Sequence, residues 1–220
     1  MFLLIGAGFH NIFLRPIIGK AFLPQIVITF SAALMIESLA TYFWTADYRY
    51  VYTDYARISF DLLGIKLPLI YIISFVISMA AVAFLHLFLT RTYLGNAIRA
   101  TAQNREAAQI AGVNIRKVET LATSLSVAFA ALAGALLSMI FVLTPNVGER
   151  WTLKAIIVVT LGGFGNIYGV IPAGLMLGLI ELTSSLFIPG SMSYAAGLVL
   201  MLIVLLCKPY GLFGLKTRWA

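Results

Sequence analysis

The stretch Arg91–Lys117, RTYLGNAIRATAQNREAAQIAGVNIRK, lies between two long apolar runs. It carries one acid, Glu106, and five basic residues: Arg91, Arg99, Arg105, Arg116 and Lys117. Because translocating Lys and Arg across a bilayer is unfavourable, basic loops between membrane spans stay in the cytoplasm. The sequence therefore predicts that residues 91–117 form a cytoplasmic loop, and the orientation of every other segment follows from it.

The centre of this loop predicts one short helix that begins near Asn96 and ends at Gly112, a residue suited to a left-handed C-terminal position. Helical spacing places small residues on one narrow face of this helix: Ala100, Asn104, Ala107, Ala108 and Ala111. Such a face buries little area alone, but it allows another surface to approach the backbone closely.

The composition indicates an integral membrane protein. Apolar residues make up 61% of the 220 residues and charged residues 10%, and the mean hydropathy is +1.00. A soluble domain is about half apolar and about a quarter charged. The net charge of +7 lies mainly in predicted cytoplasmic loops, so we interpret it as a topology signal and expect no nucleic acid partner. The single cysteine, Cys207, excludes an intrachain disulfide and a cysteine-based metal cluster.

The apolar runs predict an all-α polytopic membrane protein, a bundle of about six transmembrane helices plus a partial N-terminal span. The predicted crossings are residues 24–44, 68–90, 118–143, about 149–163, 166–187 and 192–207. Met1–Leu14 is apolar but reaches only roughly 21 Å as a helix, short of a bilayer core near 30 Å. We therefore expect an N-terminal segment to be missing from this chain.

Charge sets the expected sides of the membrane. Residues 45–67 balance three acids against three bases and hold four tyrosines, which indicates an outer hairpin or interfacial segment. A binding surface for an external partner is the alternative for this segment. The basic residues of the tail, Lys208, Lys216 and Arg218, predict a cytoplasmic C-terminus.

Two groups of residues are candidates for a translocation pathway. Gly162-Gly163-Phe164-Gly165-Asn166 interrupts two apolar runs, and non-helical backbone at membrane depth persists only beside protein or water. A plain tight turn is the alternative interpretation of this glycine stretch. Glu37 and Glu181 lie inside predicted spans, where a carboxylate is costly and faces a cavity or a partner. They could form a relay, or they could be hydrogen-bonded packing residues near helix ends.

No catalytic constellation is evident, so we expect no enzyme. The two histidines lack a second ligand at metal-site spacing, and the sequence predicts neither a metal nor a cofactor. There is also no GxxxxGK[ST] phosphate loop. If ATP drives this protein, another chain hydrolyses it.

The segment Glu106-Ala107-Ala108-Gln109-Ile110-Ala111-Gly112 resembles the cytoplasmic signature of permease subunits of ATP-binding-cassette (ABC) importers. Four further blocks are similar to the LivH/LivM-type permeases of branched-chain amino acid importers: residues 94–100 (LGNAIRA), 161–166 (LGGFGN), 178–181 (GLIE) and 208–214 (KPYGLFG). The I-x-L-P that continues the longer importer signature is absent here. Members of this family also usually carry several dozen further apolar residues before the equivalent of Met1.

This resemblance implies a single permease domain over residues 1–220 in the bacterial inner (plasma) membrane. It implies a homologous second permease subunit, ABC ATPase subunits and an extracytoplasmic solute-binding protein as partners. The segment assigned to ATPase coupling includes Arg99, Glu106, Ala107, Ala108 and Gly112. Branched-chain amino acids or related small solutes such as urea and amides are the implied substrates. The rival interpretation is a self-sufficient channel or a proton-coupled carrier that uses Glu37 and Glu181.

Overall fold

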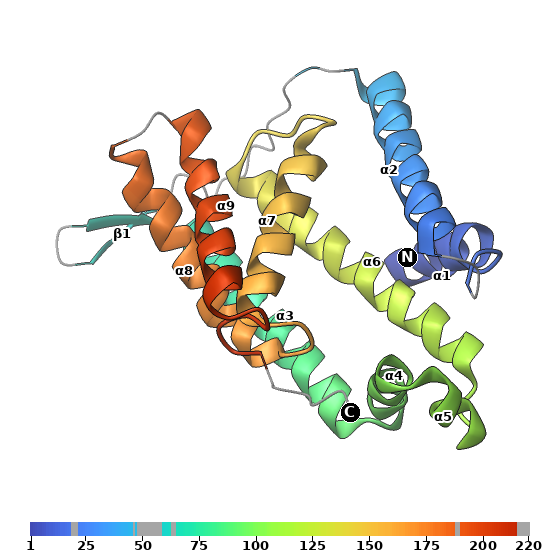
Figure 1. Cartoon of the computed structure of the whole chain (residues 1–220). Coiled ribbons are helices and arrows are strands. Elements are labelled where there is room, and N and C mark those ends of the chain that lie inside the picture. The colour runs from blue at the N-terminus through green and yellow to red at the C-terminus, as the bar shows by residue number, and fades with distance from the viewer. Residues whose placement is uncertain (19–21, 46, 48–58, 63–64, 188–189, 215–220) are drawn as a thin grey trace. The chain divides into compact units, whose positions relative to one another are not determined.

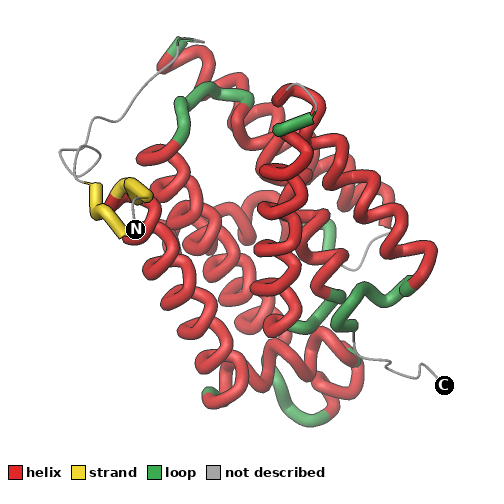
Figure 2. The backbone as a smooth tube through the Cα atoms, turned by 90° about the vertical axis from the view of Figure 1, so that its left-hand side faces the viewer, coloured by secondary structure: helices red, strands yellow, loops and turns green. Residues whose placement is uncertain are grey.

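A computed structural model of the chain describes residues 1–18, 22–45, 47, 59–62, 65–187 and 190–214. Helices make up most of these residues, and the described strands form a single two-stranded hairpin (Figure 2). The chain forms two compact units, Met1–Pro145 and Asn146–Ala220. The positions of the two units relative to one another are not determined. One permease domain over the whole chain therefore stays a prediction.

The elements follow the predicted apolar runs closely (Figure 1). The first unit contains α1 (Phe2–Phe9), the π-helix η1 (His10–Leu14), α2 (Phe22–Trp44), β1 (Ser59–Leu62), β2 (Ile65–Pro68), α3 (Leu69–Arg91), α4 (Tyr93–Gln103), α5 (Arg105–Ile110) and α6 (Ile115–Ile140). The second unit contains α7 (Val147–Gly162), α8 (Ile167–Ser185) and α9 (Gly190–Cys207). Each predicted crossing thus coincides with a helix to within a few residues.

Four described helices are long and apolar enough to cross a membrane: α2, α3, α6 and α8. The helices α7 and α9, with 16 and 18 residues, are short, as predicted for the first and last of the three C-terminal crossings. The fold class predicted from the sequence, an all-α polytopic membrane protein, is confirmed.

The first unit is held together by α1 and η1 packed against α6. At Gly6 an added Cβ would lie 2.6 Å from the Cα of Ser124, so only glycine permits this approach. One turn later His10, only 3% exposed, has its Nδ1 3.1 Å from the hydroxyl of Thr123. These contacts place η1 beside the N-terminal half of α6.

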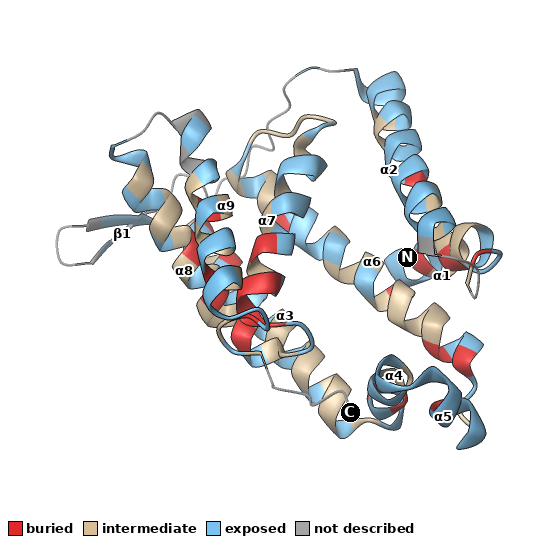
Figure 3. Ribbon diagram, viewed as in Figure 1, coloured by how far each residue is buried: buried red, intermediate tan, exposed pale blue. Residues whose placement is uncertain are grey.

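The second unit has its own apolar core, where α7, α8 and α9 meet (Figure 3). The core residues are Ile157, Leu161, Ala173, Leu177 and Val204. By contrast, among the hydrophobic residues of α2 whose burial the structure describes, only Ala32 is buried, and the others are exposed or half-buried. A helix that is apolar on all sides is suited to contact with lipid or with another chain.

Hydroxyl groups in the long helices mostly donate to the backbone of their own helix. In α2, the hydroxyl of Ser31 donates to the carbonyl of Val27 at 2.7 Å, and that of Thr41 to the carbonyl of Glu37 at 2.9 Å. The same i−4 bond recurs in α6 at Thr120 and Ser126. These helices therefore contain hydroxyls whose donor capacity is satisfied without a second helix.

The hairpin lies between α2 and α3 in sequence and pairs β1 with β2 antiparallel. Asp61 lies opposite Lys66, an arrangement that favours the pairing of opposite charges. The tyrosines of the predicted outer segment, residues 48–55, lie outside the described residues. The observed hairpin of β1 and β2 follows these tyrosines, so the expectation of a hairpin or interfacial segment at the tyrosines stays a prediction.

Candidate functional site

The predicted helix from Asn96 to Gly112 is wrong, because the structure contains two helices with a break at Asn104 (Figure 1). Asn104 is extended, with φ −152° and ψ 107°, and its Oδ1 accepts a hydrogen bond from the N–H of Ala107 at 2.9 Å. Asn is among the best helix N-caps because its side chain satisfies a free N–H of the first turn. The small residues therefore do not form one continuous face.

The start of α4 is fixed by its junction with α3. The hydroxyl of Thr92 accepts from the N–H of Gly95 at 3.0 Å and donates to the carbonyl of Phe88 at 2.7 Å. A Cβ on Gly95 would meet the backbone of Phe88 and Leu89. The chain therefore turns sharply at the end of α3, and α4 leaves it at once.

The end of α5 is a Schellman motif, as the glycine stop predicts. Gly112 has φ +84°, its N–H donates to the carbonyl of Gln109 at 3.0 Å, and the N–H of Val113 donates to the carbonyl of Ala108 at 3.0 Å. The left-handed position predicted for Gly112 is confirmed. No atom lies within 4 Å of a Cβ built at this residue, so its requirement for glycine is conformational.

The helix α5 presents one face to the outside and buries the opposite one. Ala108 is buried, whereas Glu106, Ala107 and Ile110 are exposed on the other side. The side chain of Ile110 is 88% exposed, the largest exposure of any bulky apolar residue of α3 to α6. We call Glu106, Ala107 and Ile110 the α5 surface. Arg99, the remaining residue assigned to coupling, is exposed on α4.

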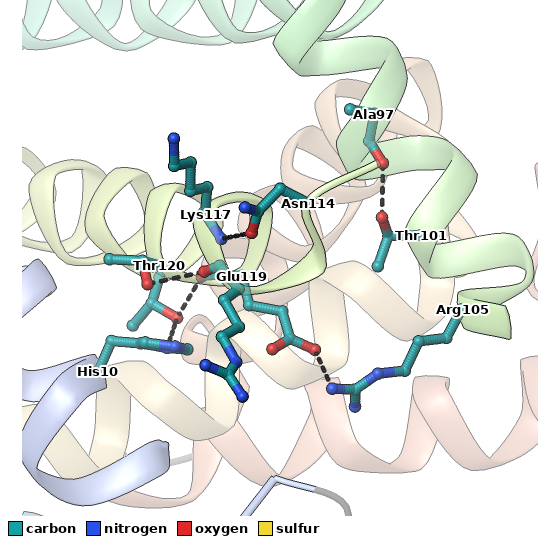
Figure 4. A network of polar contacts seen from close by, with 10 residues as sticks. His10, Ala97, Thr101, Arg105, Asn114, Lys117, Glu119 and Thr120 are labelled. Atoms are coloured by element: carbon teal, nitrogen blue, oxygen red, sulfur yellow. Dashed lines mark hydrogen bonds and ion pairs between the residues drawn. The ribbon is translucent and has the colours of Figure 1, made fainter. Parts of the chain in front are cut away.

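An ion pair ties α5 to α6. The guanidinium of Arg105 lies 3.0 Å from the carboxylate of Glu119 (Figure 4). The Oδ1 of Asn114 accepts from the N–H of Lys117 at 3.2 Å and caps α6. Three side-chain N-caps, at Thr92, Asn104 and Asn114, and the Arg105–Glu119 ion pair hold the α5 surface in a defined orientation. Sequence spacing could not reveal the pair, because the two residues belong to different helices.

The glycine stretch after α7 is a tight turn against which the C-terminal tail packs. The N–H of Leu212 donates to the carbonyl of Leu161 at 2.9 Å, and the Nδ2 of Asn166 donates to the carbonyl of Phe213 at 2.6 Å. The Oδ1 of Asn166 also accepts from the N–H of Tyr168 at 3.1 Å and so caps α8. Residues 161–166 and 208–214, two blocks of the sequence resemblance, therefore form one structure.

Close backbone contacts explain the glycines of this turn. A Cβ on Gly163, which has φ +88°, would lie 2.5 Å from the Cα of Gly214. A Cβ on Gly162 would lie 2.8 Å from the carbonyl of Gly169. Gly165 has φ +82° but open space around it. The assignment of Gly162, Gly163, Gly165 and Asn166 to a translocation pathway stays a prediction.

The two intramembrane acids have different surroundings. The carboxylate of Glu181 accepts a hydrogen bond from the ammonium of Lys154 at 2.7 Å. The side chain of Lys154 is 25% exposed and that of Glu181 is 19% exposed. Lys154 also lies 4.9 Å from the centre of the Trp151 ring. Glu37 is half-buried on α2 and, within the described residues, has no ion pair. Because Glu37 lies in the first unit, it is not placed relative to Glu181.

Substitutions of Lys154 and Glu181 are expected to have non-additive effects on the thermal stability of the protein. Replacing one partner leaves the other charge unpaired. Lys154→Met alone and Glu181→Met alone should therefore each destabilise the protein more than the double variant Lys154→Met/Glu181→Met does. Interaction energies in such contacts are about 0.5–3 kcal/mol. The measurement is thermal unfolding of the purified chain in detergent. Purely additive losses would show that the pair contributes nothing to folding.

Within the described residues, no group of three or more His, Cys, Asp or Glu side chains could hold a metal ion. The described side chains that cap helices are Thr92, Asn104, Asn114 and Asn166. The fold and its sites define a polytopic helical membrane protein with a structured, exposed loop between α3 and α6.

Comparison with known proteins identifies the family. A sequence model of the family described as "Branched-chain amino acid transport system / permease component" matches residues 3–207, and the chain belongs to this family. The high-affinity branched-chain amino acid permease protein LivH of Escherichia coli K12 is 33% identical over 140 residues, covering 63% of this chain and 46% of that protein. A probable branched-chain amino acid transport permease protein LivH of Methanocaldococcus jannaschii is 29% identical over 171 residues, covering 74% of this chain and 54% of that protein.

The similarity extends to a sugar permease. The ribose import permease protein RbsC of Bacillus subtilis is 33% identical over 156 residues, covering 66% of this chain and 46% of that protein. This chain spans about half the length of the curated relatives it matches. No solved structure matches it significantly.

Proposed function

We propose that this chain is the membrane subunit of an ABC importer that translocates branched-chain amino acids or a related small solute. A separate ATPase subunit supplies the energy. The observation that carries the proposal is the match of the permease family over residues 3–207. A homologous second permease and an extracytoplasmic solute-binding protein complete the proposed assembly.

The geometry of residues 92–119 supports a docking role for the α5 surface. A single exposed apolar side chain is ordinary on a protein surface, so the docking role rests on the resemblance of residues 106–112 to the importer signature and on the exposure of this face. Ile110 is such a side chain, and Glu106 lies one turn before it on the same face. The capped turns around α5 restrict its motion, so a displacement of a partner could be transmitted to α3 and α6. We assign this surface to the ATPase.

The proposed orientation places residues 91–117 and the C-terminus in the cytoplasm and the hairpin β1–β2 outside. With Cys207 changed to Ser, a cysteine at Gln103 is expected to react only with reagents that reach the cytoplasm. A cysteine at Asp61 is expected to react with an impermeant maleimide added to intact cells. Both positions are exposed, so accessibility to solvent does not limit the reaction. Labelling of Gln103→Cys in intact cells would reverse the orientation.

Transport measurements test the proposed function directly. Uptake of radiolabelled leucine by cells that contain the chain should cease when the partner ATPase carries a Walker-lysine substitution. Uptake should persist under a protonophore while cellular ATP is maintained. The tagged chain should also retain the ATPase during purification in mild detergent. Uptake that instead follows the proton gradient and survives loss of the ATPase would favour a carrier based on Glu37 and Glu181.

A further inference from the structure

A large pocket opens in the first unit at the ends of α3, η1 and α6 nearest the basic loop. Its volume is about 870 Å³, within the range of ligand pockets, roughly 300–1,000 Å³. Its walls come from α1, η1, α3, α5 and α6. The function proposed above does not use this pocket.

The mouth of the pocket is basic. Arg15, Arg105 and Arg116 line it together with one acid, Glu119. Three guanidinium groups and one carboxylate leave an excess of two positive charges. Because Arg105 is paired with Glu119 at 3.0 Å, the described ion pairs leave Arg15 and Arg116 without a carboxylate partner. Lys117 also borders the pocket, but its ammonium points away from the Arg105–Glu119 pair (Figure 4).

The inner end of the pocket is apolar and continues along the helices. A second hollow of about 490 Å³ shares Leu3 and Leu125 with the first. Its other walls include Ile77 and Phe84 from α3 and Phe129 from α6. The two hollows therefore adjoin, with cationic groups at one end and only apolar and small side chains at the other.

We infer that these two hollows bind one anionic phospholipid. Its phosphate lies between Arg15 and Arg116, and an acyl chain follows the groove past Phe84 and Phe129. Arginine binds phosphate oxygens through paired N–H groups, and basic pockets between membrane helices suit anionic headgroups. The lipid takes up the charge excess at the mouth and covers apolar surface in the groove at the same time.

Other ligands fit this arrangement less well. A soluble phosphate or nucleotide would occupy the basic mouth but leave the adjoining apolar groove uncovered. An amino acid would need a carboxylate for its ammonium group, and Glu119, the only acid among the described residues that line the pocket, is paired with Arg105. A second copy of this chain would bring its own basic residues to an already basic mouth.

Native mass spectrometry of the full chain released from detergent tests this inference. The probes are phosphatidylglycerol and phosphatidylcholine with identical acyl chains. We expect phosphatidylglycerol to be retained preferentially, and Arg15→Gln/Arg116→Gln to lower its retention at least about tenfold, since each charged hydrogen bond is worth roughly a factor of ten. Arg15→Lys/Arg116→Lys should recover part of it. The matched control is Arg91→Gln/Lys208→Gln, which removes two exposed charges outside the pocket and should leave retention unchanged.

Each remaining outcome overturns the inference. Equal retention of the two lipids would show that the mouth does not recognise a phosphate charge. An equal loss in the Arg91→Gln/Lys208→Gln control would show attraction by net charge alone. Displacement of the lipid by millimolar inorganic phosphate would identify a soluble anion site, and dimers that form independently of added lipid would identify a second copy as the occupant. Unfolding temperatures without lipid verify that the variants fold. Because the readout involves no transport, its failure would leave the proposed function untouched.

Discussion

Gly163→Ala is expected to destabilise the second unit by about 2–5 kcal/mol. A left-handed backbone costs a residue with a Cβ roughly 1–2 kcal/mol, and forced movement in packed structure adds roughly 1–3 kcal/mol. Both apply here, because Gly163 has φ +88° and its new Cβ would lie 2.5 Å from the Cα of Gly214. The tail would have to leave the turn, and the hydrogen bond between Asn166 and Phe213 would be lost with it. Thermal unfolding in detergent measures the effect.

Two glycines provide matched controls with the same added methyl group. Gly165→Ala carries the conformational cost without a clash, because φ is +82° and no atom lies within 4 Å of its Cβ. Gly178→Ala lies within α8 in open space and should be neutral or slightly stabilising, since Ala favours a helix over Gly. The expected order of loss is Gly163, then Gly165, then Gly178. If Gly163→Ala unfolds at the temperature of the Gly178 variant, the tail does not pack on the turn as described.

If the proposed ATPase docks on the α5 surface, Ile110→Asp is expected to weaken that complex about 10- to 100-fold. Burying an isoleucine side chain contributes roughly 1.5–3 kcal/mol, and 1.4 kcal/mol is about a factor of ten in affinity. The variant also places a desolvated charge in the contact. Glu106→Ala should reduce the same affinity by removing one charged hydrogen bond. Substrate-stimulated ATP hydrolysis by the reconstituted complex and retention of the ATPase during purification provide the measurements.

The structure separates this effect from misfolding. Glu106 and Ile110 are exposed, so their replacement should change the unfolding free energy by no more than about 0.5 kcal/mol. Asp61→Ala, an exposed substitution on the hairpin, should leave both folding and ATPase retention unchanged. If Ile110→Asp assembles and hydrolyses ATP like the parent, the α5 surface is not the site of ATPase docking.

The crossings could be predicted from the sequence because their signals are local. Runs of apolar residues, interfacial aromatics such as Trp44 and breakers such as Gly162-Gly163 place the ends of α2, α3, α7 and α8 within a few residues. The break at Asn104 was missed because helix-favouring residues flank it on both sides. Asn104 is compatible with a helix interior, and only its bond to the N–H of Ala107 identifies it as a cap.

The site was harder to predict because its contacts join distant residues. The pairing of Lys154 with Glu181 spans 27 positions, and the bond from Asn166 to Phe213 spans 47. The sequence analysis identifies Glu181 and Asn166 as candidates but does not identify Lys154 and Phe213 as their partners. The exposure of Ile110 could not be predicted either, because the pattern of so short a helix does not show which face another element covers. The glycine stop at Gly112 was predicted correctly, because a left-handed cap depends on one residue type.

The self-satisfied hydroxyls of α2 and α6 bear on how the protein is made. A nascent segment leaves the translocon for the lipid before its neighbours have been synthesised, and an unpaired polar group in hydrocarbon costs several kcal/mol. Ser31, Thr41, Thr120 and Ser126 already donate to their own backbone, so this cost is reduced from the moment each helix forms. Such a helix is stable in the bilayer before its neighbouring helices are present, so helix packing can follow after synthesis of the chain is complete.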